Sequence, residues 1–258
     1  MKSEEEIVIE KSIEIAKEFA NHILESPLKQ LGGILSDTIG FWRLKNQVNI
    51  LVKAQKYVND RGIEPTKVLP DIFVPIIEEG GSVEDPDLQD MFAKLLASHL
   101  DDKQDRLPLR SFAKTLALLS PSHSVVLRMA YALNTQFDRM SERAAASYDR
   151  IPLTPEMIEA KLDSPSDWLI PDHLCSIGIF EEKDPKGGRI SIKSAVFEEV
   201  NKALTDGIMG MHQSTEKKTF ELTGYGGFFC DACIGKSEEI YKLCEQLVSD
   251  DRFTHIDI

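Results

Sequence analysis

PLKQLGGILSDTIGFWRLKNQVNILVKAQKYV, residues 27–58, is the first of two stretches that decide the fold of this chain. Its second half places apolar residues at steps of three and four, which predicts an amphipathic helix over 41–60. Gly62 follows as the glycine that commonly ends a helix. The apolar stripe of this predicted helix consists of Phe41, Leu44, Val48, Leu51 and Val58.

The second decisive stretch is EEGGSVEDPDLQDMFAKLLASHLDD, residues 78–102. Ser82 or Asp85 is expected to cap a helix there, because short polar side chains accept hydrogen bonds from the free N–H groups of a first turn. Pro86 fits the first helical position, where no N–H is needed. The core stripe of this helix is expected to be Leu88, Met91, Phe92, Leu95, Leu96 and Leu100.

Periodicity and turn signals predict a mainly α fold along the rest of the chain. We expect a helical domain over 1–150 and a smaller winged-helix-like α+β unit over 151–258, with a soft boundary near Arg150. Further N-terminal helices are predicted over 4–24, around 72–77, over 111–118 and from Ser120 through Leu133. The C-terminal unit is expected to contain helices from Thr154, over 168–177, 195–204, 228–234 and 238–248, and strands over 179–182, 189–192 and 218–222.

Charge is unevenly distributed over a chain of 258 residues with a formal net charge of −13. Residues 28–67 contain seven basic and three acidic side chains, whereas 78–105 contain nine acidic side chains and two lysines. The overall acidity argues against a protein whose whole surface binds phosphate backbones. The two segments are either separate solvated helix faces or surfaces that meet each other, within one subunit or between subunits.

Location is predicted from what the sequence lacks. No run of about 18 apolar residues is present, which argues against a membrane-spanning helix. The start, MKSEEEIVIEKS, is acidic and has no apolar signal core. Four cysteines are too few for a disulfide scaffold and fit reduced thiols. We therefore expect a cytoplasmic protein.

The first decisive stretch also supplies the candidate interaction surface. Its small residues would let another backbone approach closely, at a packed corner, at an oligomer contact or on a membrane-active surface. Its basic residues beside a tryptophan would suit a protein contact, or the clamping of phosphates and stacking of bases. The residues are Gly32, Gly33, Gly40, Trp42, Arg43, Lys45, Lys53 and Lys56.

The remaining motifs predict no catalytic residue, metal site, cofactor or small-molecule substrate. Cys230 and Cys233 form an isolated pair in an apolar segment, and zinc would need two further ligands at suitable spacing. His173 and Cys175 resemble part of a zinc deaminase motif, but Cys175 stands where that chemistry needs a glutamate. The glycines of 224–227 lack the lysine of a phosphate-binding loop and are expected to form turns.

Three blocks of sequence stand out by their order along the chain. They are the opening block from Leu31 to Asn46, the block from Pro75 to Ala97, and the closing block from Leu222 to Cys233. Together they resemble the abortive infection alpha family of bacterial phage-defence proteins, with Phe92 in place of a usual tryptophan. The resemblance implies anti-phage defence and brings no established catalytic residues. We expect action by recognition or assembly, with a protein partner or self-association. A nucleic-acid-binding regulator and a membrane-acting effector remain alternatives that are not favoured.

Overall fold

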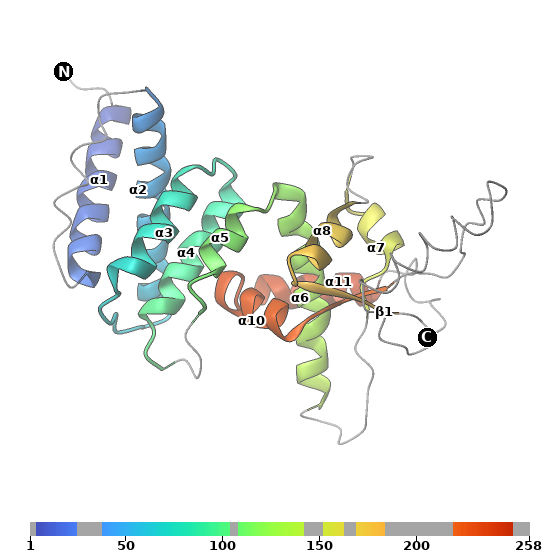
Figure 1. The fold of residues 1–258 in the computed structure, drawn as a ribbon. Coiled ribbons are helices and arrows are strands. Elements are labelled where there is room, and N and C mark those ends of the chain that lie inside the picture. The colour runs from blue at the N-terminus through green and yellow to red at the C-terminus, as the bar shows by residue number, and fades with distance from the viewer. Residues whose placement is uncertain are drawn as a thin grey trace. The chain divides into compact units, whose positions relative to one another are not determined.

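The computed structural model describes residues 4–24, 38–103, 108–141, 152–162, 169–183 and 219–249. These residues are mainly helical, with one small antiparallel sheet toward the C-terminus, which confirms the predicted fold class (Figure 1). The described helices are α1 (Glu4–Ile23), α2 (Thr38–Asp60), α3 (Pro70–Gly81), α4 (Pro86–Leu100), α5 (Phe112–Ala117), α6 (Pro121–Ser141), α7 (Pro155–Glu159), α8 (Ile170–Ser176), α10 (Gly224–Cys233) and α11 (Glu238–Ser249).

The chain divides into two compact units that alternate along the sequence. The first unit consists of Met1–Ser124 and Phe228–Gly235, and the second of Val125–Gly227 and Lys236–Ile258. The domain boundary expected near Arg150 lies outside the described residues and stays a prediction.

Helix α2 is the centre of the first unit, because it packs against α1, α3 and α4. Helix α4 lies so deep that its residues are buried from Met91 through Leu100, including Lys94 and His99. The Asp85 side chain caps α4 as predicted, accepting hydrogen bonds from the backbone N–H groups of Asp87 at 3.1 Å and Leu88 at 2.9 Å. The apolar stripes of both decisive stretches therefore meet in one core.

Two predicted helix ends depend on glycine. Gly62 follows α2 with φ of 62°, and Gly178 follows α8 with φ of 79°. Both values lie in the left-handed region that a residue with a Cβ rarely adopts. The chain can therefore turn sharply after each helix.

The sheet of the second unit joins distant segments of the chain. Strand β1 (Phe180–Lys183) pairs with β2 (Thr219–Leu222), so that Phe180 lies opposite Leu222 and Lys183 opposite Thr219. Both strands were predicted, and a third strand was predicted over 189–192. That segment and the helix expected over 195–204 lie outside the described residues.

The glycines of 224–227 correct another expectation, because they form the first turn of α10 rather than a separate turn. The Thr223 hydroxyl accepts a hydrogen bond from the Gly226 N–H at 2.8 Å. A Cβ on Gly226 would lie 2.1 Å from the carbonyl oxygen of Ile179. Glycine is required there because the helix backbone packs directly on the residue before β1.

Candidate interaction surface

Helix α2 carries the described part of the predicted surface. Arg43, Lys45 and Lys56 are exposed on it, whereas Trp42 is partly buried. Lys53 is also partly buried and donates a hydrogen bond from Nζ to the carbonyl oxygen of Pro86 at 2.8 Å. The basic helix therefore contacts the acidic segment within the subunit. Gly40 lies in the first turn of α2, and Gly32 and Gly33 lie outside the described residues.

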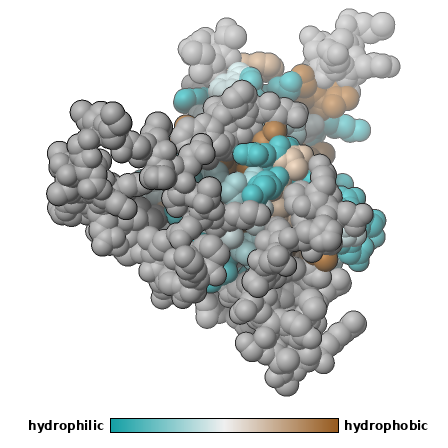
Figure 2. All heavy atoms as spheres, turned by 90° about the vertical axis from the view of Figure 1, so that its right-hand side faces the viewer, coloured by the Kyte–Doolittle hydropathy of each residue, from teal (hydrophilic) through white to brown (hydrophobic). Residues whose placement is uncertain are grey.

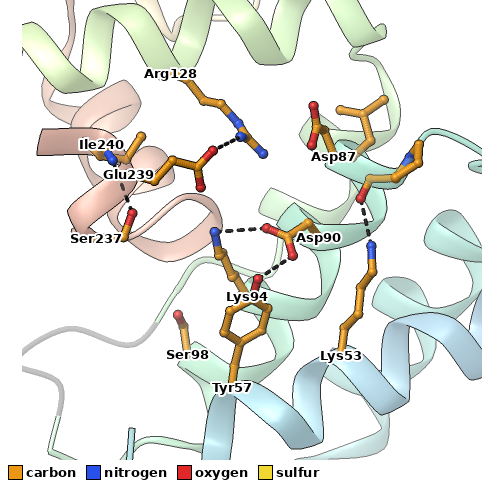
Figure 3. Close-up of polar contacts among 12 residues, drawn as sticks. Lys53, Tyr57, Asp87, Asp90, Lys94, Ser98, Arg128, Ser237, Glu239 and Ile240 are labelled. Atoms are coloured by element: carbon orange, nitrogen blue, oxygen red, sulfur yellow. Dashed lines mark hydrogen bonds and ion pairs between the residues drawn. The ribbon is translucent and has the colours of Figure 1, made fainter. Parts of the chain in front are cut away.

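A polar cluster lies between α2 and α4 next to Lys53 (Figure 3). The Tyr57 hydroxyl donates a hydrogen bond to Asp90 Oδ1, and Lys94 Nζ lies 2.9 Å from Asp90 Oδ2. The same ammonium group lies 5.2 Å from the centroid of the Tyr57 ring, within cation–π range. These contacts hold the tyrosine, the carboxylate and the ammonium group as one unit.

The electrostatics of Asp90 follow from this arrangement. Burial by itself raises the pKa of the carboxyl group, because it disfavours the charged form. The hydrogen bond from Tyr57 and the charges of Lys94 and Lys53 outweigh burial, and the pKa of Asp90 is lowered from its usual value. Asp90 is thus a stable carboxylate paired with Lys94. Such a group is better suited to holding α2 against α4 than to transferring a proton.

Buried side-chain amides form a second set of hydrogen bonds between the helices. Asn46 Nδ2 of α2 donates to the Gly81 carbonyl at the end of α3 at 3.1 Å. Gln89 Nε2 of α4 donates to Asn46 Oδ1 at 3.1 Å and to the Val83 carbonyl at 2.8 Å. These two side chains link α2, α3 and α4 and satisfy carbonyl groups that a helix end leaves free.

Close packing against α2 explains the glycine pair that ends α3. A Cβ on Gly80 would lie 2.6 Å from Ile50 Cδ1 and 3.1 Å from Phe92 Cγ. A Cβ on Gly81 would lie 3.0 Å from Gln47 Cγ. The sequence pointed instead to Gly32, Gly33 and Gly40 as sites of close approach, and missed this pair because glycines after a helix look like an ordinary helix end.

The cysteines of the predicted pair lie on α10 and are fully buried. Burial raises the pKa of the Cys230 thiol, and the charge of Asp231 adds to the effect. Burial also raises the pKa of Cys233, and the opposing charge of Lys94 is too weak to reverse it. Both groups are therefore protonated thiols packed in the core. Within the described ranges, no three histidine, cysteine or acidic side chains are grouped as metal ligands.

An apolar groove lies on the other side of α2, between the N-terminal halves of α1 and α2. It has a volume of about 180 Å³. Val8 at its edge is 63% exposed and Phe41 is 47% exposed, which is unusual for large apolar side chains on packed helices. Lys45 lines the same groove, so one residue of the predicted surface lies here. The groove is lined by Val8, Ile9, Ser12, Ile13, Phe41, Leu44, Lys45, Val48 and Asn49.

Comparison with protein families identifies the family of this chain. A family model described as abortive infection alpha matches residues 45–233, well over half of the sequence. The chain belongs to the abortive infection alpha family. Comparisons with curated proteins and with solved structures found no match.

The match to the abortive infection alpha family model covers the buried polar contacts between α2, α3 and α4 but only part of the groove. It begins at Lys45, so the predicted opening block lies outside it except for Lys45 and Asn46. It includes the cluster around Asp90 and ends at Cys233, the last residue of the predicted closing block. Helix α1 and Phe41 lie before the matched range. The exposed apolar residues of the groove therefore lie in a part of the chain that the family model does not cover.

Membrane contact was one of the alternatives for the glycine-containing stretch. None of the helices in the part of the chain that the structure describes has the length and apolarity needed to cross a bilayer. Where described residues are visible in Figure 2, hydrophilic surface lies beside smaller hydrophobic areas.

Proposed function

We propose that this protein acts in the bacterial cytoplasm in abortive-infection defence against phage, by binding and assembly rather than by catalysis. Membership of the abortive infection alpha family supports the defence role. The observation that carries the binding role is the groove between α1 and α2, where Val8 and Phe41 present apolar surface to solvent. Exposed apolar surface of this kind is characteristic of protein contact sites.

Four of the described titratable groups have shifted pKa values, and their surroundings support the same proposal. Cys230 and Cys233 are protonated by burial, and Asp90 is paired with Lys94. Burial lowers the pKa of His99 to about 4, which leaves it a neutral core residue at neutral pH. A general base works best with a pKa near the working pH and with access to a substrate, and these four residues lack that combination.

The basic helix gives less support to nucleic-acid binding than its sequence suggested. Lys53 directs its ammonium group to the Pro86 carbonyl, and Lys45 lines the apolar groove. Without these two lysines, Arg43 and Lys56 are the exposed bases of the predicted set on α2, in a chain with a net charge of −13. Phosphate-backbone binding depends on many such contacts acting together.

Protection of cells from phage tests this proposal. Bacteria expressing the chain should form fewer plaques than control bacteria, and cultures should survive a low phage dose but collapse at a high dose. Phe41→Glu should abolish protection, because it places a charge in the groove. Leu118→Glu is the matched control, because Leu118 is a similarly exposed apolar residue outside the groove, and it should leave protection unchanged.

The opposite result would favour catalysis. His173 and Cys175 are partly exposed polar groups on α8. If His173→Ala or Cys175→Ser removed protection at unchanged protein level and thermal stability, while Phe41→Glu retained it, the binding proposal would be wrong.

A further inference from the structure

The first unit contains a short segment that comes from far along the chain. The unit is continuous from Met1 to Ser124 and is joined by Phe228–Gly235, which is the end of α10 and the two residues after it. Apart from Phe228 and Asp231, every residue of this segment is buried. A helix that is buried nearly all round belongs to a core. The core of the first unit is therefore complete only when the chain returns to it.

The returning segment covers groups of α4 and α5. Ser98 Oγ of α4 donates a hydrogen bond to the carbonyl oxygen of Ala232 at 3.0 Å. The ring of Phe112, the first residue of α5, lies edge-on to the rings of Phe228 and Phe229, with centroids 5.3 Å and 5.2 Å away. Ser98 is 1% exposed and Phe112 is 0% exposed. Without the segment, a buried hydroxyl would lose its acceptor and a core ring would lose its apolar contacts.

Helix α10 has little tendency to be helical by itself. Its first turn contains Gly224, Gly226 and Gly227, and each glycine makes a helix about five-fold less favourable than alanine would. A helix of 10 residues is also too short to persist alone in water. Gly235, with φ of 71°, ends the segment in the left-handed region. The helix therefore forms because its site in the first unit holds it, so that docking and helix formation occur together.

We propose that residues 228–235 are a latch that switches the first unit between a folded and an unfolded state. With the latch docked, α4 is covered and packs against α2. With the latch released, α10 loses its helix and the first unit loses part of its core. Because the groove between α1 and α2 lies in the same unit, a segment near the C-terminus controls a surface near the N-terminus. This inference goes beyond the proposed function and does not depend on it.

Thiol labelling of the full chain in urea tests the coupling. Cys230 and Cys233 lie in the latch, and Cys244 lies on α11 of the second unit as an internal reference. Trp168→Phe leaves Trp42 of α2 as the only tryptophan, so that its fluorescence reports the first unit. Pulses of iodoacetamide, read by mass spectrometry, should label both latch thiols over the urea range in which Trp42 unfolds. Latch thiols that react while Trp42 is native, or stay protected after it unfolds, overturn the proposal.

Two buried positions on neighbouring helices give a matched pair of substitutions. Ala232 in the latch and Ile240 on α11 are each 3% exposed. Ala232→Asp places a charge in the latch, and Trp42 should report an unfolded first unit without urea. Ile240→Asp places the same charge in the second unit, and the Trp42 transition should keep its midpoint. A native Trp42 signal in Ala232→Asp, or its loss in Ile240→Asp, contradicts control by the latch.

A substitution that strengthens the latch keeps the test independent of unfolded variants. A Cβ on Gly227 would meet nothing within 4 Å, so Gly227→Ala raises helix propensity without a clash. Labelling of Cys230 and Cys233 in native buffer should slow about five-fold, because a buried thiol reacts only when the helix opens. Gly226→Ala is the control of opposite sign, since its Cβ would lie 2.1 Å from the carbonyl oxygen of Ile179, and labelling should become faster. Unchanged labelling of both thiols in Gly227→Ala overturns the proposal.

Discussion

The two sides of α2 differ in how completely their side chains are buried and hydrogen-bonded within the chain. Toward α4, Tyr57 and Lys94 hold Asp90, and Asn46 and Gln89 link three helices through hydrogen bonds. Toward α1, Val8 is 63% exposed and Phe41 is 47% exposed. The first side stabilises the unit, and the second has apolar surface left for a partner. Substitutions on the first side should therefore change folding, whereas those on the second should change association.

Asp90→Leu should give the largest loss of stability. It leaves the ammonium group of Lys94, whose side chain is 11% exposed, without its carboxylate and removes the acceptor of the Tyr57 hydroxyl. An unpaired buried charge is costly, and we expect the free energy of unfolding to fall by about 3 kcal/mol. Urea denaturation followed by circular dichroism measures the change.

The double variant Asp90→Leu/Lys94→Met is the control for this explanation. It removes both charges and keeps apolar volume, so much of the lost stability should return. If the double variant is as unstable as the sum of the two single variants, the Asp90–Lys94 pair is not the source of the effect.

His99 should give the next largest effect, as a dependence of stability on pH. Burial lowers its pKa from 6.5 to about 4, so between these values the unfolded chain binds a proton that the folded chain does not. Stability from this group is complete above pH 6.5 and is lost as the pH falls toward 4. The loss between pH 7 and pH 5 should be about 2 kcal/mol.

His99→Gln separates this effect from other acid effects. The variant should lose about 2 kcal/mol less than wild type between pH 7 and pH 5, because glutamine does not titrate. Asp90 acts in a lower window, since its pKa is lowered and its stabilisation is lost only at more acidic pH. An equal pH dependence in wild type and His99→Gln would assign the acid sensitivity to other groups.

Local signals in the sequence were sufficient for the helices of the first unit. The apolar steps over 41–60 and the Asp85–Pro86 cap predicted α2 and α4, because both depend on residues within a few positions of each other. Gly62 was predicted to end α2 for the same reason, and it adopts the left-handed conformation that suits a helix end. These features follow from backbone sterics and helix geometry, which need no knowledge of the rest of the fold.

Features that join distant segments were not predicted. The pairing of β1 with β2 links Phe180 to Leu222, and nothing in the periodicity of either segment distinguishes this partner from a nearer one. The hydrogen bond from Gln89 to Asn46 spans 43 positions, and each residue alone looks like an ordinary surface amide. The groove was missed too, because Val8 and Phe41 fit apolar helix stripes that are normally buried.

Lys53→Met should give a smaller change on the α4 side. It removes the hydrogen bond to the Pro86 carbonyl while keeping the length of the side chain. Because Lys53 is only partly buried, we expect a loss of about 1 kcal/mol in the free energy of unfolding. Lys56→Met on the same helix is the matched control and should be neutral, since Lys56 is exposed. Equal effects of the two substitutions would contradict a folding role for Lys53.

Val8→Ala should give the smallest change in stability, and Val58→Ala is its matched control. Val8 is 63% exposed at the groove, whereas Val58 is 2% exposed in the core side of α2. Removing two methyl groups from the core should cost about 2 kcal/mol, but at Val8 the same atoms are mostly in water in both states, so the loss should stay below about 0.5 kcal/mol.

The effects of the two valine substitutions on association should have the reverse order. If a second copy covers the groove, Val8→Ala removes apolar area that is buried only in the dimer, and dissociation should increase several-fold at an unchanged unfolding free energy of the monomer. Val58→Ala should leave the dissociation constant unchanged wherever the chain is folded. Sedimentation at several concentrations, combined with urea denaturation, measures both quantities. A Val8→Ala chain that loses as much stability as Val58→Ala would mean that the groove is closed within the single chain.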